Sequence, residues 1–147
     1  MQTIALRIGF FVLIGIGAFI ARPYLMGNVG ELKVGDCFDV PSVTETIEDV
    51  QHHPCTDAHE AEVFFVGKLS TADGVPYPDD DALASMVQPV CTPVFDAYTG
   101  LSVATDPVWT YGAVVPLEAG WAAGERDLMC YANRMDDKPT SASIKKS

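Results

Sequence analysis

The longest apolar run in the chain lies near its start, where Ile8 to Ala21 (IGFFVLIGIGAFIA) contains no charged side chain. These 14 residues are fewer than the ~20 that a spanning helix needs, but a segment over 3–25 reaches that length if Arg7 extends to the near headgroups and Arg22 marks the far interface. A cleaved signal peptide is disfavoured, because Phe19 occupies a position where cleavage requires a small residue. The pattern therefore predicts an uncleaved membrane anchor over residues 1–27.

Beyond the anchor, short stretches rich in Val, Phe and other strand formers are separated by turn residues. Apolar residues at 83, 87, 90, 94 and 98 have helical spacing instead, with acidic residues before them for an N-cap and Gly100 after them as a stop. Pro89 and Pro93 lie inside this helical pattern and predict a kink or two short helices. The expected strands cover 37–40, 47–50, 61–69, 108–115 and 127–133.

These elements predict an α+β fold, in which a small, mostly antiparallel sheet carries one main, kinked helix. With the anchor, the chain divides into residues 1–27, a domain over 28–134 and a polar tail over 135–147. For the tail, an edge strand near 140–144 and disorder both remain open. With 147 residues, the chain is long enough for one ordinary core.

Charge is distributed unevenly along the chain. All 20 acidic residues and seven of the nine basic ones follow position 27, so this part carries 7 − 20 = −13. Such acidity argues against nucleic acid as a partner. Within the anchor, small residues recur at four-residue steps and predict packing against a transmembrane helix of another membrane protein. These helix-packing residues are Ala5, Gly9, Gly17 and Ala21.

Four cysteines follow the anchor: Cys37, Cys55, Cys91 and Cys130. An even number behind a membrane segment indicates two disulfides in an oxidising compartment. The sequence leaves three pairings open. We therefore expect the chain to lie in the cell membrane with a cytoplasmic N-terminus and an extracytoplasmic domain.

The stretch HHPCTDAHEAEV, residues 52–63, gathers the three histidines of the chain near Cys55 and several carboxylates. His53 and His59 have spacings that zinc or copper could use, but a disulfide would remove Cys55 from the ligand set. The alternative for His59 is a partly buried side chain bonded to a carboxylate or a backbone carbonyl. No nucleophile elbow, P-loop, dinucleotide fingerprint or C-x-x-C motif is present, so we predict no enzyme activity and no cofactor.

Four blocks, LKVGDCFDV, PCTDAHEAEVF, CTPVFDAY and WAAGERDLMC, together resemble the septum formation family of actinobacterial membrane-anchored proteins. The resemblance covers Leu32 to Cys130. It implies the pairs Cys37–Cys55 and Cys91–Cys130, a place for His59 in the fold rather than in a metal site, and no known enzyme activity. The family name implies a link to cell division.

These inferences give an expectation for function. We expect a non-enzymatic, single-pass membrane protein that binds other membrane proteins through its anchor and its extracytoplasmic domain. The protein would be an accessory subunit of a larger assembly, either the cell-division machinery or a respiratory, energy-transducing complex. The alternatives are a zinc or copper protein, or an enzyme, that uses His53 and His59, and an envelope sensor that binds a cell-wall ligand.

Overall fold

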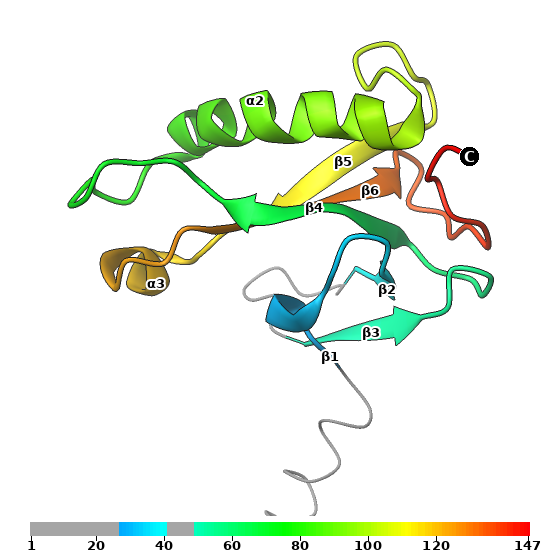
Figure 1. Cartoon of the computed structure of the whole chain (residues 1–147), viewed down its shortest axis with the longest axis horizontal. Helices are drawn as coiled ribbons and strands as arrows, with labels where there is room; N and C mark the ends of the chain where they lie inside the picture. Colours follow the sequence, from blue (N-terminus) through cyan, green and yellow to red (C-terminus); the bar gives the residue numbers. More distant parts are fainter. Residues whose placement is uncertain (1–26, 41–48) are drawn as a thin grey trace, which may run out of the picture.

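The computed structural model describes residues 27–40 and 49–147, which form an antiparallel sheet with helices packed around it (Figure 1). The sheet has six strands in the order β1-β3-β2-β4-β6-β5, and all the strand pairs of the described ranges are antiparallel. The predicted α+β class and its antiparallel sheet are confirmed. The elements are β1 Gly27–Asn28, a 3-10 turn Val29–Glu31, β2 Cys37–Asp39, β3 Asp49–His53, β4 Ala61–Lys68, α2 Asp80–Thr99, β5 Trp109–Val114, α3 Glu118–Ala122 and β6 Asp127–Arg134.

The membrane anchor predicted over 1–27 falls almost wholly outside the described residues. Its helix-packing residues Ala5, Gly9, Gly17 and Ala21 all lie there. In the ranges that the structure describes, none of the helices is both long and apolar enough to cross a membrane.

The main helix, α2, runs without interruption over 20 residues, so the alternative of two short helices is wrong. Pro89 and Pro93 remove two backbone donors, but both are exposed, and water can satisfy the carbonyls that lose their partners. The predicted ends are confirmed. Asp79 accepts a hydrogen bond from the Ala82 N–H at 2.8 Å, and Gly100, in the left-handed region at φ 75°, ends the helix.

One face of the sheet packs against α2 in the larger of two apolar clusters (Figure 1). The helix contributes Val87, Cys91 and Phe95 at four-residue spacing, so that one stripe is buried. Phe64 of β4 meets Phe95 edge to face, with ring centroids 5.6 Å apart. A bulge between Val63 and Phe65 inserts Phe64 into β4 and so adds an aromatic ring to the cluster.

The opposite face of the sheet carries the smaller apolar cluster, with Phe38 of β2 and Met129 of β6 among its members. Phe38 contacts Tyr131 edge to face at 5.5 Å. The Tyr131 ring also lies so close to Gly112 of β5 that a Cβ there would overlap it. In Figure 1, β1 and β3 lie on this side of the molecule, and α2 lies on the other. The domain is thus layered, with the first strands on one side and the helix on the other.

Candidate functional site: a buried glutamate beneath the C-terminal tail

The second residue of β4, Glu62, is a carboxylate buried inside the domain with 2 % of its surface exposed. It pairs with Cys37 of β2 on one side and Ala132 of β6 on the other, which places it near the centre of the sheet. Removing a charged carboxylate from water is costly unless hydrogen bonds replace the lost hydration. The side chains around Glu62 therefore decide whether the fold tolerates it.

Three donors surround the Glu62 carboxylate. Oε1 accepts from the Tyr98 hydroxyl of α2 and from the Ser143 hydroxyl, each at 2.7 Å, and Oε2 accepts from the Ile144 backbone N–H at 2.8 Å. Burial, helped by its bond to Glu62, raises the pKa of the Tyr98 hydroxyl, so this phenol keeps its proton and remains a donor. These four residues form the Glu62 cluster, which joins β4, α2 and the C-terminal tail.

The tail, residues 135–147, is held against the domain at further points. His59 and Thr140 exchange backbone hydrogen bonds in one antiparallel bridge, at 2.9 Å and 2.8 Å. The Lys146 N–H donates to the Tyr98 carbonyl at 3.0 Å. The tail therefore adds one β-bridge to the fold, and its last residues contact the C-terminal end of α2.

His59 is almost completely buried, with 1 % of its surface exposed. Its Nδ1 lies 2.8 Å from the Asp57 carbonyl. Because a carbonyl only accepts, Nδ1 carries the proton in this contact. Its Nε2 has no hydrogen-bond partner among the described residues. The hollow that His59 lines with Trp109, Thr140 and other residues has no room for a water molecule, so this imidazole is shielded from solvent.

The three histidines of residues 52–63 have separate roles in the structure. His52 is exposed on β3, and the Nε2 of its neighbour His53 lies 2.6 Å from a carboxylate oxygen of Asp39. His59 bonds a backbone carbonyl, as the structural alternative for this residue expects. The three histidines are therefore close in the sequence but do not share a site in the structure.

The potential metal ligands of the described residues converge in one group of three, Cys37, Cys55 and Glu62. The two sulfur atoms of this group form a disulfide, so neither is available as a thiolate ligand. The alternative metal pair His53 and His59 gains no third ligand in the ranges that the structure describes. The geometry therefore gives no support to a zinc or copper site.

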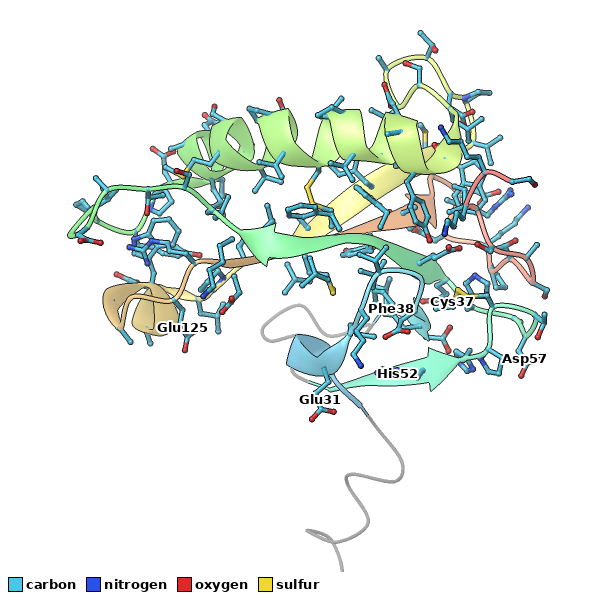
Figure 2. The ribbon with its side chains drawn as sticks, in the orientation of Figure 1. Glu31, Cys37, Phe38, His52, Asp57 and Glu125 are labelled. Atoms are coloured by element: carbon cyan, nitrogen blue, oxygen red, sulfur yellow. A yellow bond between two sulfur atoms is a disulfide. The ribbon has the colours of Figure 1, made fainter. Side chains whose placement is uncertain are left out.

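Both predicted disulfides are present, with the pairing that the family resemblance implies (Figure 2). Cys37–Cys55 joins β2 to the loop before His59 over a separation of 18 residues, with Cα atoms 5.3 Å apart. Cys91–Cys130 joins the middle of α2 to β6 over 39 residues. The first bridge lies beside the Glu62 cluster, and the second lies inside the larger apolar cluster.

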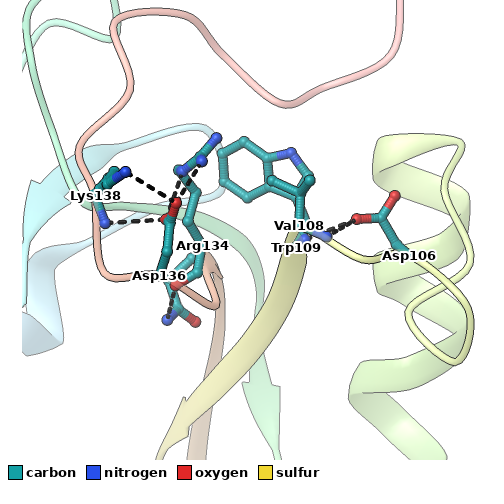
Figure 3. A network of polar contacts seen from close by, with 7 residues as sticks. Asp106, Val108, Trp109, Arg134, Asp136 and Lys138 are labelled. Atoms are coloured by element: carbon teal, nitrogen blue, oxygen red, sulfur yellow. Dashed lines mark hydrogen bonds and ion pairs between the residues drawn. The ribbon is translucent and has the colours of Figure 1, made fainter.

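A second polar network holds the turn between β6 and the tail (Figure 3). Arg134 donates through Nε and Nη2 to the two carboxylate oxygens of Asp136, at 2.8 Å and 2.7 Å. The Lys138 backbone N–H adds a bond to Asp136 at 3.2 Å. The bond from Arg134 is the main reason that the pKa of Asp136 falls to about 2. The Arg134 guanidinium also lies 5.9 Å from the Trp109 ring centroid at the start of β5.

Sequence reasoning identified His59 and the disulfides of this site but missed the partners of Glu62. Tyr98 is 36 residues away from Glu62, and Ser143 and Ile144 are 81 and 82 residues away. A hydroxyl and a backbone N–H carry no pattern that marks them as ligands of a distant carboxylate. The available signal was Glu62 itself, an acidic residue that directly precedes four apolar residues of its strand.

The WAAGERDLMC block forms the corner between α3 and β6. Trp121 is buried and donates its indole N–H to the Val75 carbonyl at 2.8 Å. Arg126 lies over the same indole ring at 3.8 Å and donates to the Thr71 hydroxyl at 2.8 Å. This corner therefore fixes the long connection between β4 and α2.

The chain is a disulfide-bonded α+β domain whose buried polar groups bind one another across distant segments. The model of the septum formation family matches residues 34–147, and the chain belongs to this family. The membership indicates a role related to cell division. Comparison with curated proteins and with solved structures gave no match.

Proposed function

We propose that this chain is a non-enzymatic, single-pass membrane protein whose disulfide-bonded domain stands outside the cytoplasmic membrane and binds partner proteins. It would act as an accessory subunit of a division-related membrane complex. The family membership, the apolar segment before residue 27 and the two disulfides all support this setting. A binding surface is the remaining requirement.

The observation that carries the proposal is an open strand edge. β5 pairs with β6 on one side, and none of the described strands pairs with its other side. The Met135 N–H donates to the Val108 carbonyl at 2.9 Å. In an antiparallel ladder the backbone groups of alternate residues face the neighbouring strand, so this bond determines which residues of β5 face β6. Backbone groups of residues 108, 110, 112 and 114 therefore face β6, and those of Trp109, Tyr111 and Ala113 face outward.

This edge lacks the features that usually block strand pairing. Trp109 to Val115 (WTYGAVV) contains no charge and no proline, whereas solvent-exposed edges are commonly protected by lysine, proline or a bulge. The Trp109 N–H is already bonded to Asp106 at 2.7 Å, and the outward N–H groups of Tyr111 and Ala113 have no partner among the described residues. An uncharged edge with free donors suits strand addition by a protein partner.

The proposal is tested by isolating the tagged full-length protein from its own membranes in mild detergent and quantifying the proteins recovered in near-equal amounts. We expect a stoichiometric set of membrane proteins. Thr110→Lys places a charge on the β5 edge without removing an outward backbone group, and should lower their recovery. Thr56→Lys, at an exposed position in the loop before β4, is the matched control.

Two results would overturn the proposal. One is recovery of the wild-type protein alone, in an extraction that preserves other membrane complexes of the same cells. The other is equal loss of partners with Thr110→Lys and Thr56→Lys, because added charge rather than the edge would then explain it.

A further inference from the structure

We infer that the β5 edge binds the β5 edge of a second copy of this chain, in an antiparallel pairing that joins two sheets about a twofold axis. The inference deepens the proposed function and rests on it in one respect, namely that the chain is held in a membrane. It names the partner of the edge as the protein itself, so Thr110→Lys would lower the recovery of other membrane proteins through loss of the dimer. Hydrogen bonding, side-chain size and the direction of the chain support this choice.

The outward backbone groups of β5 are complementary to themselves. If Tyr111 lies opposite Tyr111 of the second copy, each donates its N–H to the carbonyl of the other. Ala113 then faces Trp109 of the second copy and donates to its carbonyl, while the Trp109 N–H keeps its bond to Asp106. This register uses every free outward donor of Trp109–Val114 and leaves no outward donor of the strand unsatisfied.

Side chains in the same register also fit by size. Trp109, Tyr111 and Ala113 lie on the face of β5 that α2 covers, and all three contact the larger apolar cluster. Across the new strand pair, Trp109, the largest of these three side chains, would lie opposite Ala113, the smallest. Large and small neighbours pack well across strands, and neither copy brings a charged residue of β5 to the contact.

The direction of the chain favours a second copy in the same membrane. A twofold axis that joins two antiparallel edges into one continuous sheet runs perpendicular to that sheet, so both α2 helices lie on one side of it. In Figure 1, β1 lies on the side away from α2. The 26 residues that precede Gly27, with the predicted anchor, therefore begin from the same side in both copies. One membrane can hold both anchors.

The salt dependence of binding distinguishes a second copy from other possible partners of the edge. Two domains that each carry −13 repel one another, and salt shortens the range of this repulsion to ~8 Å at physiological ionic strength. Pairing between copies should therefore strengthen as salt is added. A basic extended segment of another protein would bind the same acidic domain less tightly at higher salt.

The test is the mass of the purified full-length protein in mild detergent, measured by light scattering over a range of protein concentrations and at two salt concentrations. We expect a monomer–dimer equilibrium that shifts toward dimer at the higher salt concentration. Ala113→Pro removes an outward N–H from each copy and should raise the dimer dissociation constant about tenfold. Thr110→Lys should act in the same direction, and Thr56→Lys should have no effect.

Two controls keep the test decisive. Circular dichroism and thermal unfolding establish that Ala113→Pro is folded, and Thr110→Lys replaces it if it is not. Gly9→Leu together with Gly17→Leu changes the anchor and leaves β5 intact. A wild-type monomer at all concentrations, or a dimer that the anchor variant abolishes and both edge variants leave unchanged, would overturn the inference. If the wild type is monomeric but loses its co-purified proteins with Thr110→Lys, the proposed function stands and the second copy is wrong.

Discussion

The domain has two buried regions that are built on different physical grounds, the larger apolar cluster beneath α2 and the Glu62 cluster beneath the tail. The first contains one disulfide, and the second lies beside the other. The first is filled by side chains such as Phe64 and Phe95, which exclude water and have no polar atoms to satisfy. The second is centred on the Glu62 carboxylate, which is stable in the interior because three donors surround it.

This difference predicts which kind of substitution destabilises each region. Apolar burial is roughly proportional to area and does not depend on direction, so the α2 side should respond to lost volume. A buried hydrogen-bonded carboxylate depends on each donor, because a group left without a partner bears the full desolvation cost. The tail side should respond to lost donors and acceptors even when volume is unchanged.

The largest effect is expected from Phe95→Ala. Phe95 is fully buried, and its ring meets those of Phe64 and Tyr111. Its removal leaves a cavity that the rigid sheet cannot fill, and should lower the free energy of unfolding by about 3–5 kcal/mol. Urea denaturation measures this change. Leu117→Ala, at a residue that is 53 % exposed, should cost less than about 0.5 kcal/mol.

The two disulfides offer the next comparison. In the loop-entropy model, replacing both cysteines of the Cys91–Cys130 pair by Ala costs about 4 kcal/mol, and the same change at Cys37–Cys55 costs about 3 kcal/mol, because the loops differ in length. Urea denaturation of the two double variants tests the order. A larger cost for Cys37–Cys55 would mean that its position beside Glu62 matters more than loop length.

A smaller but more local effect is expected from Glu62→Gln. The substitution keeps the volume but turns one acceptor oxygen into an amide donor, so at least one of the donors from Tyr98, Ser143 and Ile144 loses its acceptor. We expect a loss of about 1–3 kcal/mol, with faster hydrogen exchange at the Ile144 and Lys146 amides. Exchange at the amides of α2 near Phe95 should rise only as much as the global loss requires.

Glu118→Gln, at an exposed residue of α3, is the control for this prediction. Equal increases in exchange across the tail and α2 would mean that the Glu62 cluster is not a separate unit of stability.

The apolar region could be predicted from the sequence, and the polar region could not, for reasons that particular residues make clear. The spacing of Val87, Cys91 and Phe95 is a local signal that any buried helix repeats. Asp79 and Gly100 mark the ends of α2 by local chemistry. Pro89 and Pro93 suggested two short helices as an alternative to one kinked helix, and this alternative was wrong. Whether water can reach the freed carbonyls depends on which face of the helix the sheet covers, and the local sequence does not determine that face.

The partners of Glu62 are set by tertiary structure alone. Ser143 belongs to a polar tail for which the sequence left disorder open, and its bond to Glu62 forms where the bridge between His59 and Thr140 and the bonds of Ile144 and Lys146 hold the tail against the domain. The sequence predicted β5 as a strand but not as the edge of the sheet, since strand order depends on pairings between distant segments.

The smallest effect, and the one most specific to the tail side, is a pH dependence from Asp136. Arg134 lowers the pKa of this carboxyl from its usual 3.8 to about 2 in the folded protein. The folded state therefore binds this proton less readily than the unfolded chain, so the stabilisation is complete above pH 3.8 and is lost as the pH falls through 2. The contact is exposed and salt screens it, so the effect should be small.

The measurement is the difference in urea midpoint between the wild type and Asp136→Asn at pH 6 and at successively lower pH, in low salt. The difference should shrink as the pH approaches 2, because the wild-type carboxylate then becomes neutral like the amide of the variant. Asp73→Asn, at an exposed loop residue, corrects for the general effect of removing a negative charge. A difference that stays constant between pH 6 and pH 2 would mean that the substitution acts through the geometry of the contact with Arg134 rather than through the charge of Asp136. The turn at the start of the tail would then resemble the apolar cluster in its indifference to pH.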